Sequence, residues 1–171
     1  MDAWVLHRAG AARHQPAARS DLRPPAADGD PLHGSRDQGG GMIAALALLA
    51  TAVLFGGMVL YSFGFAAFLF NALPADEAGA LLRRAFPHFY LFVIGAALIA
   101  AGLAYWSDQA AAILLALVAL TTWPTRSHLM PAINRATDAG DTKRFHRLHG
   151  LSVVITLIHI AVAGWVLIRF L

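Results

Sequence analysis

The last apolar segment of the chain carries polar side chains at helical spacing. In the stretch HGLSVVITLIH these are His149, Ser152, Thr156 and His159. They fall within about 80° of one another on a helix that advances about 100° per residue. An ionisable side chain at membrane depth is costly and usually faces the bundle interior at a functional site. The predicted intramembrane polar site therefore consists of Asn71 from the first apolar segment with Ser152, Thr156 and His159.

A structural interpretation of the same residues is also open. The imidazole of His159 would then be neutral and bonded to a neighbouring helix, while Ser152 and Thr156 would donate to carbonyl oxygens of their own helix. Under the functional interpretation, the four polar residues line a water-accessible path through the membrane.

A second group of polar side chains lies near one predicted membrane boundary. Its members flank three different apolar segments, and they are Arg83, Arg84, His88, Asn134 and His149. Basic side chains at such a boundary are ordinary anchors to lipid headgroups. We therefore expect a polar rim on the cytoplasmic side of the membrane.

Histidines near the same boundary raise the question of a metal or haem site. The candidates are His88, His128, His146 and His149, and the last two form an i, i+3 pair without a carboxylate motif such as HExxH. The chain has no cysteine, which excludes thiolate ligands. His159 has no intramembrane histidine partner for a two-haem arrangement. We expect no metal and no cofactor, with haem or metal binding by these histidines and His159 as the alternative.

The residues needed for common catalytic arrangements are missing. The few serines lack a nearby aspartate and histidine set, and no phosphate-cradling glycine loop is present. Asp138 and Asp141 in TDAGDTK are typical of a turn. We therefore expect a protein that is not an enzyme.

Small residues recur every seven positions in the first apolar segment, at Ala50, Gly57 and Gly64. Small side chains allow the backbones of membrane helices to approach closely. The stripe predicts helix packing inside the bundle, and a dimer seam or substrate path is the other interpretation.

Composition defines the elements that position these residues. The 171 residues are 58% hydrophobic and only 13% charged, unlike an ordinary soluble domain. Pro74 stops the first apolar run, and Pro124 is expected to bend the third. The predicted fold is all-α, a polytopic membrane protein whose residues 42–171 form an antiparallel bundle of four transmembrane helices, with spans at 43–73, 86–106, 110–130 and 148–170.

The first 41 residues differ sharply, with five arginines, five aspartates, four prolines and few large apolar side chains. Such a segment buries too little apolar surface to offset its ordering entropy. We expect residues 1–41 to be a disordered N-terminal extension, or an artefact of start-site choice with Met42 as the natural start.

The distribution of basic residues predicts the orientation. Loops 74–85 and 131–147 with their flanks carry seven basic residues, whereas the opposite side carries Arg169 alone; the seven are Arg83, Arg84, Arg126, Arg135, Lys143, Arg144 and Arg147. The positive-inside rule places both loops in the cytoplasm and both termini of the 42–171 domain in the periplasm. The net charge of +3 is thereby explained by membrane topology, without nucleic acid.

The chain resembles the bacterial family called domain of unknown function 4149, which is related to the eukaryotic transmembrane protein 205 group. The resemblance rests on GMVLYSFGFAAFLFNALPADEAGALLRRAFPHFY, HLMPAINRATDAGD and RFHRLHGLSVVI. It implies a four-span integral membrane protein of the bacterial inner membrane and leaves the chemistry open.

These observations predict an inner-membrane protein that acts as a small membrane scaffold or a transporter-like component. Its expected partners are membrane lipids, together with a second copy of the chain or another membrane protein. The haem- or metal-binding interpretation is the alternative.

Overall fold

The structure is a computed structural model that describes the backbone of residues 31–170 and the side chains of residues 39–170. Every element in this part of the chain is helical. In chain order they are α1 (Pro31–Val59), the π-helical turn η1 (Leu60–Phe65), α2 (Ala66–Ala72), α3 (Ala75–Ala104), α4 (Gln109–Pro124), the π-helical turn η2 (Thr125–Leu129), α5 (Met130–Asp138) and α6 (Thr142–Phe170).

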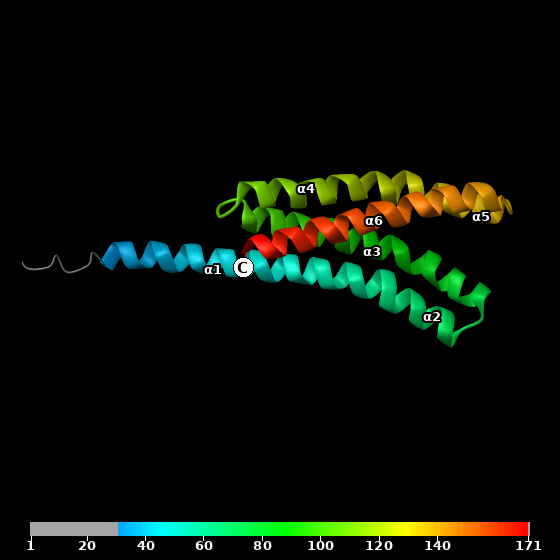
Figure 1. The fold of residues 1–171 in the computed structure, drawn as a ribbon, viewed down its shortest axis with the longest axis horizontal. Helices are drawn as coiled ribbons and strands as arrows, with labels where there is room; N and C mark the ends of the chain where they lie inside the picture. Colours follow the sequence, from blue (N-terminus) through cyan, green and yellow to red (C-terminus); the bar gives the residue numbers. More distant parts are fainter. Residues whose placement is uncertain (1–30, 171) are drawn as a thin grey trace, which may run out of the picture.

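These elements join into four continuous helices that are long and apolar enough to cross a membrane. They are Gly39–Ala72, Ala75–Ala104, Gln109–Asp138 and Thr142–Phe170. Figure 1 shows them lying side by side, with alternating chain direction. The prediction of an all-α, four-helix antiparallel membrane protein is confirmed.

The four helices form a ring of neighbours. α1 packs against α3, α3 against α4, α4 against α6, and α6 against α1. α3 and α6 therefore face each other diagonally across the bundle interior. The α2–α3 and α5–α6 connections meet at one end, which we call the basic end because it carries the seven basic residues named above. The α3–α4 connection and the C-terminal end of α6 lie at the other end, the Asp108 end.

The segment predicted as the loop 74–85 is mostly helical. Only Leu73 and Pro74 interrupt the helix, and α3 begins at Ala75. Asp76 and Glu77 lie in its first turn, where carboxylates interact favourably with the positive end of the helix dipole. The second helix therefore starts eleven residues before the predicted span at 86.

The segment predicted as the loop 131–147 is also mostly helical. α5 continues the third helix to Asp138, and α6 begins at Thr142. Gly140 makes the tight turn possible because its φ of 65° is a conformation that glycine adopts without steric cost. In both segments, the polar residues that end the apolar pattern continue the helix.

The first helix also begins earlier than predicted. Residues 1–30 lie outside the described residues, so the expected disorder is untested there. Residues 31–41, which that prediction also covered, belong to α1. Pro31 is the first residue of α1, a position where its fixed φ favours the helix and its missing N–H costs nothing.

The bundle interior changes character from one end to the other. Towards the Asp108 end, buried alanines line the interface of α3 and α4; examples are Ala97, Ala100, Ala104, Ala111 and Ala119. Towards the basic end, aromatic rings fill the space between η1 and α3, and Tyr61 stacks on Phe89 with ring centroids 4.5 Å apart. The helices are therefore close at the Asp108 end and splayed at the basic end (Figure 1).

Gly57 lies at the contact between α1 and α3. A Cβ atom at this position would come within 2.5 Å of the Phe92 ring. Ala50 packs against the buried core, and a Cβ at Gly64 would meet Leu60 of its own helix at 3.1 Å. Two of the three stripe residues, Ala50 and Gly57, therefore pack against other helices of the same chain.

We expect Gly57→Leu to destabilise the protein by about 1–3 kcal/mol, because the new side chain must displace Phe92. Thermal unfolding of the detergent-solubilised protein measures the effect. Gly56→Leu is the matched control, since a Cβ at Gly56 meets nothing within 4 Å and leucine is the better helix former. Equal melting temperatures for the two variants would contradict the packing role of Gly57.

Asp108 contacts three helices at its end of the bundle, beginning with α3, where its backbone amide donates to the Ala104 carbonyl at 2.8 Å. Its side chain caps α4 by accepting from the Ala111 amide at 3.0 Å, and it forms an ion pair with Arg169 of α6 at 2.8 Å. The Ala111 hydrogen bond, followed by the hydrogen bond from Arg169, lowers the pKa of the Asp108 carboxyl group. The carboxylate form is therefore favoured in the folded protein.

We expect Asp108→Ala to cost about 1 kcal/mol of stability at neutral pH, the usual contribution of a helix N-cap. Asp108→Asn should cost less, because the amide oxygen still caps α4. Because the pKa of Asp108 is lower in the folded protein, its carboxylate stabilises the fold at pH values above 3.8, the ordinary pKa of an aspartate. This stabilisation is lost as the pH falls through the pKa of the folded state. The difference in melting temperature between the natural protein and Asp108→Ala should therefore narrow on acidification; a constant difference would contradict a charge contribution.

Candidate functional site

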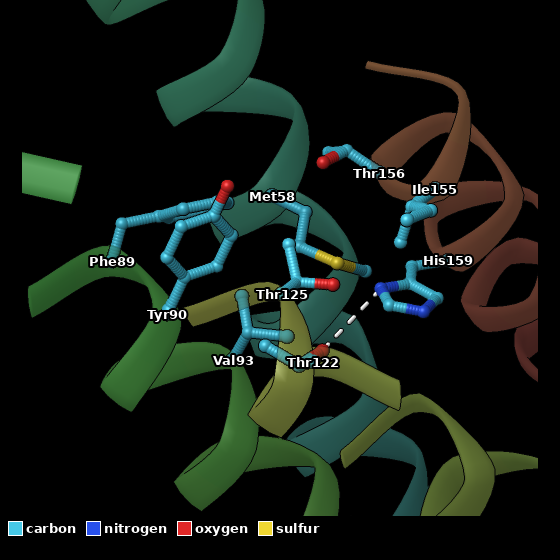
Figure 2. A pocket seen from close by; sticks show the side chains of 9 residues that line it. All are labelled: Met58, Phe89, Tyr90, Val93, Thr122, Thr125, Ile155, Thr156 and His159. Atoms are coloured by element: carbon cyan, nitrogen blue, oxygen red, sulfur yellow. Dashed lines mark hydrogen bonds between the residues drawn. The ribbon is translucent and has the colours of Figure 1, made fainter. Parts of the chain in front are cut away.

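His159 lies buried at mid-length of α6 and faces two threonines of α4. Its Nε2 atom is 2.8 Å from the Thr121 hydroxyl, and its Nδ1 atom is 3.4 Å from the Thr122 hydroxyl. Figure 2 shows the imidazole ring pointing from α6 towards Thr122, with the dashed line marking that contact. The predicted partner on a neighbouring helix is therefore present, and it is a pair of hydroxyl groups.

Hydroxyl side chains gather on both sides of Pro124 in the third helix. A proline inside a helix has no N–H to donate, and local π-helical turns together with Ser and Thr side chains compensate for such a break in membrane helices. The π-helical turn η2 follows Pro124 directly. Four hydroxyls nearby donate to carbonyl oxygens four residues earlier; they belong to Thr121, Thr122, Thr125 and Ser127.

These backbone hydrogen bonds limit what the threonines can offer His159. The hydroxyl protons of Thr121 and Thr122 point to the Leu117 and Val118 carbonyls, each at 2.6 Å. Both hydroxyl oxygens can therefore only accept from the imidazole. If the neutral imidazole carries its proton on Nε2, it donates to the Thr121 oxygen. The unprotonated Nδ1 and the Thr122 oxygen then face each other with lone pairs, which agrees with their longer distance. A second proton on Nδ1 would meet a ready acceptor, the Thr122 oxygen.

A line of polar groups leads from His159 towards the basic end. Thr156 donates to the Ser152 carbonyl at 3.0 Å, and the Ser152 hydroxyl is 3.1 Å from the phenol of Tyr90 on α3. The Tyr90–Ser152 contact crosses the bundle diagonally. The structural interpretation is thus right for Thr156 and wrong for Ser152, whose hydroxyl bonds to another helix.

A small cavity separates these groups. It has a volume of about 10 Å³, close to the minimum that one water molecule needs. Figure 2 shows the side chains around it; they belong to Met58, Phe89, Tyr90, Val93, Thr122, Thr125, Ile155, Thr156 and His159. The polar side chains of three helices therefore share one enclosed space.

The polar line ends at His159. The buried residues of α6 beyond it, towards the Asp108 end, are Ala163 and Val166, and the facing residues of α3 and α4 are the alanines described above. Over the seven residues from Ser152 to His159 the line covers about 10 Å. The polar contacts of the site thus extend from His159 only towards the basic end, as far as Tyr90 and Ser152.

Asn71 does not belong to this site. It is exposed near the end of α2, and its side-chain amide donates to the Ala67 carbonyl of the same helix at 2.9 Å. The structure places Ser152, Thr156 and His159 along α6 near the cavity and Asn71 apart from them, because Asn71 was grouped with them by polarity alone.

The predicted rim is only partly a cluster. Arg83 donates to the side chain and the carbonyl of Asn134, and it forms an ion pair with Asp138 at 2.8 Å. Both partners of that pair are substantially exposed, so it contributes little to stability. The other rim residues, Arg84, His88 and His149, are exposed at the same end of the bundle.

The histidines at the basic end make separate contacts. His88 bonds to the Arg84 carbonyl, His128 contacts Ser127, and the rings of His146 and His149 pack on Phe145. Within residues 39–170, no three His, Asp or Glu side chains are arranged to hold a metal ion.

Three residues of the site were not predicted from the sequence: Tyr90, Thr121 and Thr122. A signal was available for the threonines, because TTWPT places two adjacent hydroxyls just before a proline within an apolar helix. Tyr90 follows two other aromatic residues in FPHFY, and the sequence does not distinguish which of them faces a serine on another helix.

Comparison with known proteins supports the predicted family. Residues 49–142 match the family model described as Domain of unknown function (DUF4149). The chain belongs to this family. The DUF4149 match includes Tyr90, Thr121 and Thr122, and it ends at the first residue of α6, before Ser152 and His159. No curated protein and no solved structure matches the chain.

We expect Ser152→Ala to destabilise the protein by about 1–3 kcal/mol, because it leaves the buried phenol of Tyr90 without its partner. Combining it with Tyr90→Phe removes both polar groups and should restore most of the loss. Thermal unfolding in detergent of the two single variants and the double variant forms a complete mutant cycle. Additive effects would contradict the hydrogen bond across the bundle.

Proposed function

We propose that this DUF4149 protein is a non-enzymatic, transporter-like component of the bacterial inner membrane, and that His159 accepts and releases a proton during its cycle. The observation that carries the proposal is the contact of both ring nitrogens with threonine hydroxyls beside an enclosed cavity. Ionisable side chains inside membrane bundles commonly belong to proton relays or substrate paths.

The polar line supports a direction for proton entry. Tyr90, Ser152 and Thr156 lie between His159 and the basic end, whereas alanine and valine side chains fill the bundle interior on the other side. Proton exchange with the basic end is therefore favoured in this conformation. Transfer across the membrane requires a second conformation in which the Asp108 end opens, as in alternating access.

The charge distribution supports the orientation. The described residues of the basic end include seven arginines and lysines, while the Asp108 end has Arg169, whose charge is paired with Asp108. Cytoplasmic segments of membrane proteins carry the excess of basic residues. The proposal therefore places the basic end in the cytoplasm and the α3–α4 connection in the periplasm.

The scaffold interpretation relied on the small-residue stripe as a surface for another helix. Gly57 is in contact with Phe92 of the same chain, so this part of the stripe serves internal packing. The geometry consequently favours the transporter-like interpretation.

Proton flux through the full chain, reconstituted in liposomes that contain a pH-sensitive dye, tests the proposal. A potassium diffusion potential set with valinomycin drives the protons. We expect flux above that of protein-free liposomes, and we expect His159→Leu and His159→Gln to reduce it to background. Both variants should fold, since Thr121 and Thr122 keep their backbone hydrogen bonds.

His146→Gln is the matched control, because His146 is an exposed histidine of α6 outside the bundle interior. Its flux should equal that of the natural protein. Flux that survives in His159→Leu, or a natural protein that moves no protons, would refute the proposed role of His159.

A further inference from the structure

A lateral groove opens on the outside of the bundle between the third and fourth helices. It has a volume of about 520 Å³ and is wide open on its outer side. Pro124 and Leu129 form its wall on the third helix, and Leu151 and Ile155 form its wall on α6. Because these residues belong to the membrane-spanning helices, an occupant of the groove reaches it from within the lipid bilayer.

The groove is chemically different along its length. Its walls are mainly apolar, but His128 lines it near the basic end and is exposed. Arg147 lies four residues before Leu151 on α6, and residues at this spacing share one helix face. The exposed Arg147 is therefore placed at the same end of the groove as His128.

Two carboxylates at the same end of the bundle have other partners, and neither lines the groove. Asp138 is paired with Arg83, and Asp141 accepts from the backbone amide of Arg144 at the start of α6. The groove has positive charge at the membrane boundary and apolar walls deeper in the membrane. An anionic lipid has the matching arrangement, with a negative headgroup at the boundary and an apolar acyl chain inside the membrane.

We propose that the groove binds one anionic phospholipid of the bilayer. Its acyl chain lies along Pro124, Leu129, Leu151 and Ile155, and its phosphate lies between His128 and Arg147. The bound chain covers Thr121, which lines the groove and whose hydroxyl contacts His159. The lipid thus separates the buried site from the rest of the bilayer. This proposal does not depend on proton transport.

Native mass spectrometry of the full chain tests the proposal. The protein is released from mixed micelles that contain equal amounts of phosphatidylglycerol and phosphatidylcholine. We expect one phosphatidylglycerol to be retained in preference to phosphatidylcholine. Arg147→Gln should lower its retention about fivefold, the effect of one basic residue near an anionic surface. Arg84→Gln removes the same charge from an exposed position of α3 at the same end, and should change nothing.

A second pair of variants tests the apolar part. Leu151→Trp fills the groove and should abolish retention, whereas Leu157→Trp enlarges an exposed leucine of α6 outside the groove and should not. Circular dichroism confirms that the variants fold. Equal retention of the two lipids, equal retention by the two tryptophan variants, or equal loss in Arg147→Gln and Arg84→Gln would overturn the proposal.

The lipid measurement and the flux measurement test the two proposals independently. Retention is measured without any ion gradient, and His159→Leu leaves the groove walls unchanged. A protein that retains phosphatidylglycerol but moves no protons would support the lipid site and reject the proposed function, and the reverse result would do the opposite.

Discussion

Within a bilayer, each backbone and side-chain hydrogen-bonding group needs a partner from the protein itself. Pro124 lies within the membrane-spanning length of the third helix and has no N–H to donate to the preceding turn. It is followed by the π-helical turn η2, and threonine and serine hydroxyls around it donate to nearby carbonyls. Among residues 39–170, no buried side-chain nitrogen or oxygen lacks a hydrogen-bond partner. The hydroxyl groups around this proline thus supply the polar side chains of the third helix that face the bundle interior.

The same hydroxyl groups connect the two proposed sites. Thr121 and Thr122 use their protons on the backbone, so their oxygens are left as acceptors for His159. Thr121 also lines the lateral groove next to Pro124. Threonine at position 121 therefore has three neighbours: its own helix backbone, the buried imidazole and the space that we assign to a lipid. A substitution there changes all three surroundings at once.

Hydropathy predicted the four helices and their antiparallel order, because three of the apolar runs are long enough to cross the hydrocarbon layer. The third run is too short by itself, and its span was predicted to continue beyond Pro124, as the helix does. Hydropathy did not predict the helix ends, since the polar residues at 75–85 and 131–147 are compatible with helix as well as loop. Helical periodicity predicted the burial of Ser152 and His159. The partners Tyr90 and Thr122 depend on how neighbouring helices are rotated, and one sequence without a structure contains little information about that rotation. Asn71 shows the same limit, because its polarity said nothing about which side of its helix faces the bundle.

The bundle is narrow where alanines pack and wide where aromatic rings fill its interior. Between membrane helices, association depends on van der Waals contact and hydrogen bonds, because lipid chains are as apolar as the protein interior. Separating the helices at the alanine end would break closely spaced backbone contacts and the Asp108–Arg169 ion pair. At the other end, rings such as Tyr61 and Phe89 would exchange one apolar neighbour for another. Moving η1 and α2 away from α3 therefore requires less work than separating the helices at the alanine end.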